Sequence, residues 1–93
     1  MNLRTDAEAI TAEILRQAGA AGSERSISPN DVARALAERA GAPEEWRRLL
    51  GPVRGAALRL AEAGRIEILR KGKPVASPAE ARGVIRLRIA GGA

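Results

Sequence analysis

Residues 46–64 constrain the fold more than any other stretch of the chain. They show the longest helical periodicity, contain the only aromatic residue, and lead directly into a segment with the alternation of a strand. Gly51 and Pro52 interrupt this helical pattern, because proline removes a helical hydrogen bond and clashes with the preceding turn. We therefore predict a short helical turn over residues 44–50 and a new or kinked helix over residues 52–63.

The helix over residues 52–63 has one apolar side. Its buried face is predicted to consist of Leu49, Val53, Ala56, Ala57 and Leu60. Because the chain has no Phe and no Tyr, the core must be built from Ala, Leu, Ile and Val. Trp46 is interpreted as a core anchor over the junction with the preceding helix, rather than as a base-stacking residue.

A first helix is predicted over residues 6–18. Thr5 and Glu8 have the spacing of a capping box, in which each side chain accepts a hydrogen bond from the other residue's backbone N–H. Gly19 and Gly22 are expected to end this helix. The apolar stripe consists of Ala7, Ile10, Ile14 and Ala18, and we expect the charged residues on the solvated back.

A second helix is predicted over residues 29–40. Ser28 is the expected N-cap, Pro29 fits the first helical position, and Asp31 completes the capping box. Gly41 is expected to stop the helix. Its buried stripe would consist of Val32, Ala33, Leu36, Ala37 and Ala40.

Two strands are predicted in the last third of the chain, over residues 65–70 and 84–89. Both segments alternate apolar and charged residues, and a turn over residues 71–74 follows the first. The strands would form a hairpin with a long, basic, proline-containing tip. Residues 25–27 could add a strand of one or two rungs.

This order of elements predicts one domain over residues 1–93, with an ordered core at about residues 5–89. Two consecutive helices followed by a hairpin are typical of a helix-turn-helix with a wing. The predicted fold class is therefore α+β and mainly α, a winged helix with a C-terminal β-hairpin wing.

Three spaced blocks of the chain resemble a bacterial family of unknown function, DUF3253, over about residues 5–89. The blocks are Ser28-Pro29 with residues 31–36; Trp46-Arg47, Val53-Arg54, Ala57, Leu60 and residues 64–66; and Lys71-Gly72, Val75, Pro78 and residues 83–88. Members of this family look like small winged-helix domains. The resemblance implies a fold and no particular activity.

The composition excludes several classes of site. Without cysteine or histidine, the chain has no disulfide, thiolate metal site or histidine base. Its serines have no general base of the usual kind beside them. We expect no enzymatic activity and no catalytic, cofactor-binding or metal-binding residue. The first residues do not resemble a signal peptide, and no apolar run is long enough to span a membrane, so a cytoplasmic location is expected.

Charge is distributed unevenly along the chain. Residues 1–44 contain five basic and seven acidic residues, whereas residues 45–93 contain eleven basic and four acidic ones. A basic half suggests a polyanionic partner, although arginine-rich coding in a GC-rich genome would give the same bias. The first hypothesis is binding of double-stranded DNA, mainly through phosphates. The candidate residues are Arg47, Arg48, Arg54 and Arg59 near the third helix, and Lys71, Lys73 and Arg82 on the wing.

The alternative is a protein-interaction module that does not bind nucleic acid. Winged helices serve in either role, since the fold does not fix the function. Several arginines could then be structural and pair with Glu38, Glu44 or Glu45, or with backbone carbonyls at helix ends: Arg34, Arg47, Arg54, Arg86 and Arg88. The outward Arg86 and Arg88, with Leu69 across the hairpin, would form a face for a protein partner. The sequence leaves the oligomeric state open.

Overall fold

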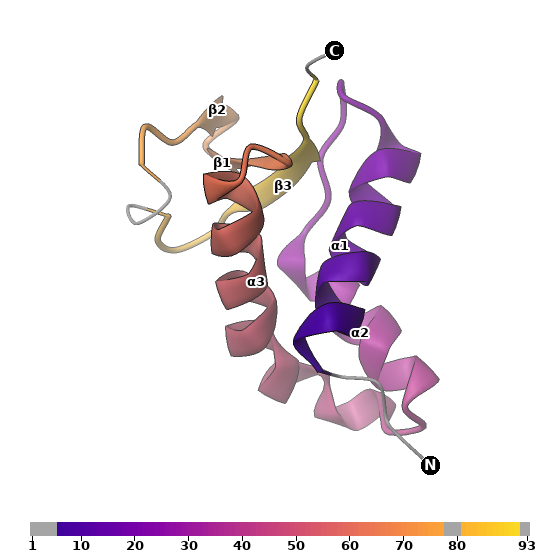
Figure 1. The fold of residues 1–93 in the computed structure, drawn as a ribbon. Coiled ribbons are helices and arrows are strands. Elements are labelled where there is room, and N and C mark those ends of the chain that lie inside the picture. The colour runs from indigo at the N-terminus through magenta and orange to yellow at the C-terminus, as the bar shows by residue number, and fades with distance from the viewer. Residues whose placement is uncertain (1–5, 78–80, 92–93) are drawn as a thin grey trace.

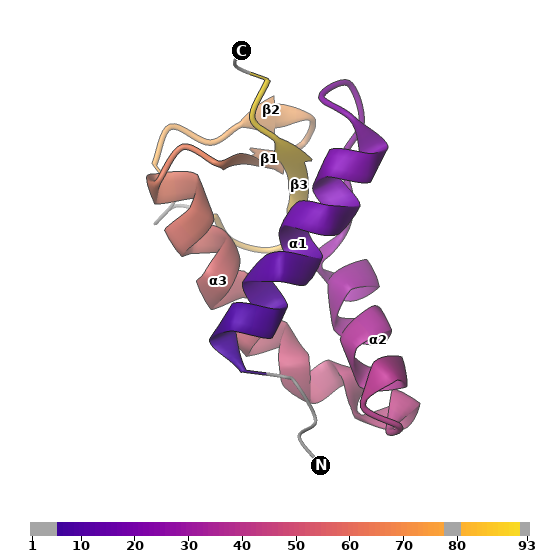
Figure 2. The same cartoon turned by 45° about the vertical axis from the view of Figure 1, so that its right-hand side comes forward.

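The computed structural model describes residues 6–77 and 81–91 of the chain. The elements are the helices α1 (Ala7–Ala21), α2 (Pro29–Arg39) and α3 (Leu50–Glu62), the 3-10 helix η1 (Pro43–Leu49), and the strands β1 (Ile66–Arg70), β2 (Lys73–Pro74) and β3 (Arg86–Ile89). The three helices pack together, and the sheet lies at the C-terminal end of α3 (Figures 1 and 2). This is the α+β, winged-helix-like arrangement predicted from the sequence.

Helix α1 differs from the prediction at both ends. Its N-cap is Asp6, whose side chain accepts a hydrogen bond from Ala9 N at 2.9 Å, while the predicted cap, Thr5, lies outside the described residues. The prediction that the helix ends at residue 18 is wrong, since it runs on through Gly19. Glycine is only mildly unfavourable inside a helix. The helix stops at Gly22, whose φ of 86° an L side chain rarely adopts.

Helix α2 begins as its sequence predicts. The Ser28 hydroxyl accepts a hydrogen bond from Asn30 N at 3.0 Å, and the Asp31 carboxylate accepts one from Ser28 N at 3.2 Å. Gly41, with φ of 79°, follows the helix and reverses the chain. The capping box therefore fixes the start of α2, and a left-handed glycine fixes its end.

The break between η1 and α3 lies near the predicted position, although α3 begins at Leu50, two residues earlier than expected. Pro52 is the third residue of α3, where its missing N–H removes no intrahelical bond. At the other end, Gly64 has φ of 77° and Arg65 N donates to the Leu60 carbonyl at 2.9 Å. This pattern is a Schellman cap, and it directs the chain into β1.

The sheet has the strand order β2-β1-β3, and both pairings are antiparallel. Lys71 and Gly72 form the two-residue turn between β1 and β2 with φ of 54° and 82°, as a type I′ turn requires. The predicted turn over residues 71–74 is therefore too long, because its last two residues pair with β1. Ile27 adds the predicted short rung through two backbone hydrogen bonds with Leu87, at 2.7 and 2.8 Å.

The core is aliphatic and lies between the helices and one face of the sheet. It contains Ile10, Ile14, Ala18, Ile27, Val32, Ala33, Leu36, Val53, Ala56, Ala57, Leu60, Ile66, Ile68, Ile85 and Leu87. Leu49 and Trp46 are only half-buried and pack against the edge of this core. Trp46 thus contacts the core at its edge, which is a weaker role than the anchor expected from the sequence.

Candidate nucleic-acid interface

Arg54 of α3 connects the helix to the loop that returns from the wing. Its Nη1 atom donates a hydrogen bond to the carbonyl oxygen of Gly83 at 3.2 Å. Arg82, the preceding residue, is exposed. Arg70, at the end of β1, also lies beside this loop, since a Cβ built on Gly83 would be 3.7 Å from its Nη2. Three arginines from three segments therefore meet around Gly83.

The basic character continues from this point along the wing. Arg70 of β1 lies directly opposite Lys73 of β2 in the strand register, and Lys71 occupies the turn between the two strands. All three side chains are exposed, as is Arg59 on α3. We call these residues together the basic surface: Arg54, Arg59, Arg70, Lys71, Lys73 and Arg82.

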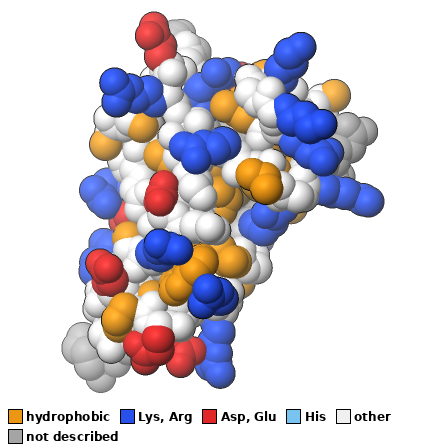
Figure 3. Space-filling view, turned by 180° about the vertical axis from the view of Figure 1, so that it is seen from behind, with side chains coloured by type: hydrophobic (Ala, Val, Ile, Leu, Met, Phe, Trp, Pro, Cys, Tyr) orange, Lys and Arg blue, Asp and Glu red, His pale blue; other side chains and the backbone are white. Residues whose placement is uncertain are grey.

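The charges of the basic surface are not neutralised within the part of the chain that the structure describes. The ion pairs between described residues involve Arg16, Arg39, Arg48 and Arg88. None of them includes a residue of the basic surface. In the space-filling view from behind, Lys and Arg side chains are spread over both sides of the molecule, the wing side included, whereas acidic side chains lie mostly toward the opposite side and the lower end (Figure 3). An anion approaching the wing therefore meets available positive charge.

Arg47 and Arg48, which the sequence also proposed for binding, lie elsewhere. Both belong to η1, which precedes α3 at the end away from the wing (Figures 1 and 2). Arg48 Nε forms an ion pair with Glu45 Oε1 at 2.9 Å. The Arg47 guanidinium lies over the Trp46 ring, 4.7 Å from its centroid, and Arg34 lies over the same ring at 4.3 Å. Of the seven predicted residues, the structure thus places Lys71, Lys73 and Arg82 on the hairpin and its return loop, joins Arg54 to that loop, leaves Arg59 exposed on α3, and places Arg47 and Arg48 in η1.

Arg70 is the residue of the basic surface that the sequence reasoning missed. The sequence pattern indicates only that it is the last residue of the strand predicted over residues 65–70. Its neighbours Lys71 and Lys73 are a signal that could have identified it, because a two-residue turn keeps the ends of its strands side by side. Its position next to Gly83 could not be deduced locally, since the two residues are brought together by the fold.

Glu13 was expected on the solvated side of the first helix, and this expectation is wrong. The residue is 2% exposed and accepts hydrogen bonds from Arg16, Gln17 and Arg39 at 2.5–3.0 Å. Burial opposes ionisation and would raise the pKa of Glu13, but the hydrogen bonds outweigh it and lower the pKa to about 2. In turn, the carboxylate raises the pKa of Arg16. The hydrogen bond from Arg39, the last residue of α2, therefore joins α2 to α1, whereas Arg16 binds Glu13 within α1.

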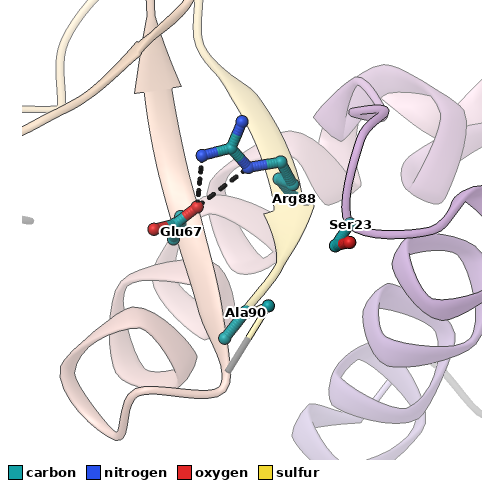
Figure 4. Close-up of a pocket in the computed structure, with 5 residues that line it drawn as sticks. Ser23, Glu67, Arg88 and Ala90 are labelled. Carbon is teal, nitrogen blue, oxygen red and sulfur yellow. Dashed lines mark hydrogen bonds and ion pairs between the residues drawn. The ribbon is translucent and has the colours of Figure 1, made fainter. Parts of the chain in front are cut away.

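The proposed face for a protein partner is also not formed as expected. Leu69 is 5% exposed, so it offers little apolar surface. The Arg86 guanidinium donates to the hydroxyl and carbonyl oxygens of Ser26 at 2.9 and 2.8 Å. Arg88 donates to Glu67 Oε1, the residue opposite it on β1 (Figure 4). These arginines hold segments of the protein together.

The Arg88–Glu67 pair borders an open hollow of about 610 Å³ at the C-terminal end of β3. Ser23, Ala90 and Gly91 form the rest of its lining, and Figure 4 shows the ion pair on one side and Ser23 on the other. The two charges of this pair satisfy each other, since the Arg88 guanidinium donates to the Glu67 carboxylate.

Within residues 6–77 and 81–91, no group of three or more acidic side chains is placed to hold a metal ion. Across the same residues, no helix is both long enough and apolar enough to cross a membrane.

Comparison with known proteins places the chain in a family. None of the curated proteins matches it in sequence. The family model described as "Protein of unknown function (DUF3253)" matches residues 7–90, from the first residue of α1 to the residue after β3. The match covers nearly the whole chain and all of its helices and strands, and the chain therefore belongs to the DUF3253 family.

Proposed function

We propose that this protein binds double-stranded DNA through the basic surface, mainly by contacts with phosphate groups. The observation that carries the proposal is the convergence of α3, the end of β1 and the return loop at Gly83, together with six cations that take part in no ion pair among the described residues. The role is binding rather than catalysis, and a cytoplasmic location, where the protein would meet DNA, belongs to the same proposal.

The arrangement of the elements supports this role. In helix-turn-helix proteins the second helix of the motif enters the major groove, and neighbouring segments contact the backbone. Here α2 and α3 form the motif, and the wing lies beside the C-terminal end of α3 (Figure 1). A groove that received α3 would bring its flanking phosphates close to the turn at Lys71 and to the loop at Arg82.

The side chains of α3 favour phosphate contacts over base reading. Arginine pairs with guanine edges, and asparagine and glutamine pair with adenine. The helix has no Asn or Gln, its exposed positions include Gly51 and the acidic Glu62, and the half-buried Gly55 offers no side chain. Arg59 is its one exposed cation. We therefore expect weak sequence preference and strong dependence on salt.

A titration of the protein with a short duplex of mixed sequence tests the proposal. Binding is expected at micromolar protein in about 50 mM salt, as is usual for phosphate-dominated recognition. If the five exposed cations each contact a phosphate, the logarithm of the affinity should fall with the logarithm of the salt concentration at a slope of about −4 to −5. An absence of binding under these conditions would refute the proposal. A protein partner that survives nuclease treatment in a pull-down would favour the interaction module instead.

A further inference from the structure

Arg54 differs from the other cations of the basic surface, because its guanidinium already binds the protein. Its Nη1 atom donates to the Gly83 carbonyl, 29 residues along the chain, at 3.2 Å, and its side chain is half-buried. Arg59, five residues further along α3, is exposed, and its side chain makes no hydrogen bond or ion pair with another described residue. The two arginines therefore share a helix but differ in their surroundings.

The hydrogen bond from Arg54 holds residues 83–85, a segment whose other anchor is the core residue Ile85. Gly83 has φ of 69°, and it precedes Val84, which is 86% exposed, and the buried Ile85, from which the chain enters β3. A hollow of about 170 Å³ separates this segment from α3 and from the start of α2. Among the described residues, the Arg54 bond is the only hydrogen bond that links α3 to residues 83–85.

We propose that Arg54 is a positioning residue, which fixes the return loop of the wing against α3, and that the phosphate contacts are made by the exposed cations. This inference rests on the proposed function. A loop that is already held in its bound position loses less conformational freedom when DNA binds, so the hydrogen bond raises affinity without touching the ligand. By holding Gly83, the hydrogen bond from Arg54 would also fix the position of the adjacent Arg82, which would contact a phosphate.

Two matched variants separate positioning from direct contact. Arg54→Met and Arg59→Met each remove one positive charge from α3 and keep a long side chain. For R54M, we expect the affinity for duplex DNA to fall by roughly five- to tenfold with the slope of the salt dependence unchanged. For R59M, we expect the slope to become shallower by about 0.9, the contribution of one phosphate contact. If R54M changes the slope as much as R59M does, Arg54 is a phosphate contact and the inference is wrong.

A second measurement tests the hydrogen bond without DNA. Trypsin cleaves after arginine, and the bond between Arg82 and Gly83 lies in an exposed loop next to the carbonyl that Arg54 holds. Brief digestion followed by mass spectrometry should show faster cleavage at this bond in R54M than in the wild type or in R59M. Equal rates in all three would overturn the inference. This comparison remains valid even if the wild type fails to bind DNA, so the failure of the proposed function and the failure of the inference can be told apart.

Gly83→Val provides a variant that changes no charge. A β-branched residue rarely adopts a positive φ, so the substitution should move the carbonyl away from Arg54. The expected result is a loss of affinity similar to that of R54M, again with an unchanged salt slope, and faster cleavage after Arg82. Wild-type affinity in G83V would contradict the positioning role. Circular dichroism of each variant confirms that the helices are intact before binding is compared.

Discussion

Glu13 is a carboxylate held among the helices by donors from two of them. Arg16 and Gln17 come from its own helix, and Arg39 comes from the end of α2. The heads of both arginines remain more than half exposed, at 64% and 60%, while Glu13 is almost fully covered. In each ion pair the carboxylate is buried while the arginine side chain stays largely in water. The free-energy cost of desolvation is therefore smaller than for a fully buried ion pair.

This arrangement predicts a loss of stability in acid. The pKa of Glu13 in the folded protein, about 2, lies below the value of about 4.3 expected for the unfolded chain. The ionised carboxylate therefore contributes stability that is fully present above pH ~4.3 and is lost as the pH falls through about 2, up to about 3 kcal/mol. Urea unfolding at pH 7 and at several values below 4.5 measures this dependence.

Glu13→Gln should lower the free energy of unfolding at pH 7 by about 1–3 kcal/mol, because a charged acceptor is lost. It should also remove most of the pH dependence between about 4.3 and 2. Glu38→Gln on the exposed side of α2 is the matched control, and it should leave both properties near wild type. An acid response that is the same in E13Q and in the wild type would show that other carboxylates cause it.

At the scale of elements, glycines of two kinds lie near the end of α1. Gly19 is inside the helix with open space around it, whereas Gly22 has φ of 86° and ψ of 166°, a conformation almost restricted to glycine. The N–H of Gly22 closes the helix by donating to the carbonyl of Ala18 at 3.1 Å. The backbone at Gly22 therefore requires glycine, whereas the helical backbone at Gly19, three positions earlier, does not.

Substitution by alanine should separate these two glycines. Gly19→Ala is expected to stabilise the protein by about 0.5–1 kcal/mol, because alanine prefers the helix and has less freedom in the unfolded chain. Gly22→Ala is expected to destabilise it by about 1–3 kcal/mol, because the backbone must remain in a disfavoured region. Thermal melts followed by circular dichroism compare the two variants. Shifts of the same sign would show that the backbone at Gly22 tolerates a side chain.

The elements could be predicted from the sequence where their signals are local. The capping box at Ser28 and the change of helix near Gly51 and Pro52 depend only on near neighbours; the first appears as predicted, and the second lies two residues earlier, between Leu49 and Leu50. The role of Glu13 could not be predicted, because Arg39 approaches it from 26 residues away. The same holds for the bond from Arg54 to Gly83, across 29 residues. The fold was thus predictable from local patterns, whereas the arrangement of the candidate site depends on tertiary contacts.

At the scale of the whole molecule, the cations near α3 form two groups. Those at η1 are engaged by Glu45 and Trp46, whereas those of the basic surface lie on α3, on the hairpin of β1 and β2, and on the loop at Gly83. Net charge alone does not distinguish these two groups. If attraction of DNA depended on net charge only, any pair of cations could be removed with the same effect.

Two double variants test where DNA binds. Lys71→Met with Lys73→Met, and Arg47→Met with Arg48→Met, each lower the net charge by two. The lysine pair should weaken duplex binding and reduce the salt slope by about 1.8, the sum of two phosphate contacts. The arginine pair at η1 should change the affinity by no more than about twofold, since only long-range attraction is lost and salt screens it. Equal losses in the two variants would show that binding does not depend on the wing.

Trp46 is also the only intrinsic fluorophore of the chain, since no tyrosine is present. Its indole lies beneath the guanidinium groups of Arg34 and Arg47, at the junction of α2 and η1. Its emission therefore reports the integrity of that junction and changes when the junction comes apart on unfolding. A ligand on the wing leaves the surroundings of the indole untouched. Tryptophan emission is thus a measure of folding in this protein, and a reporter of DNA binding must be attached near Gly83.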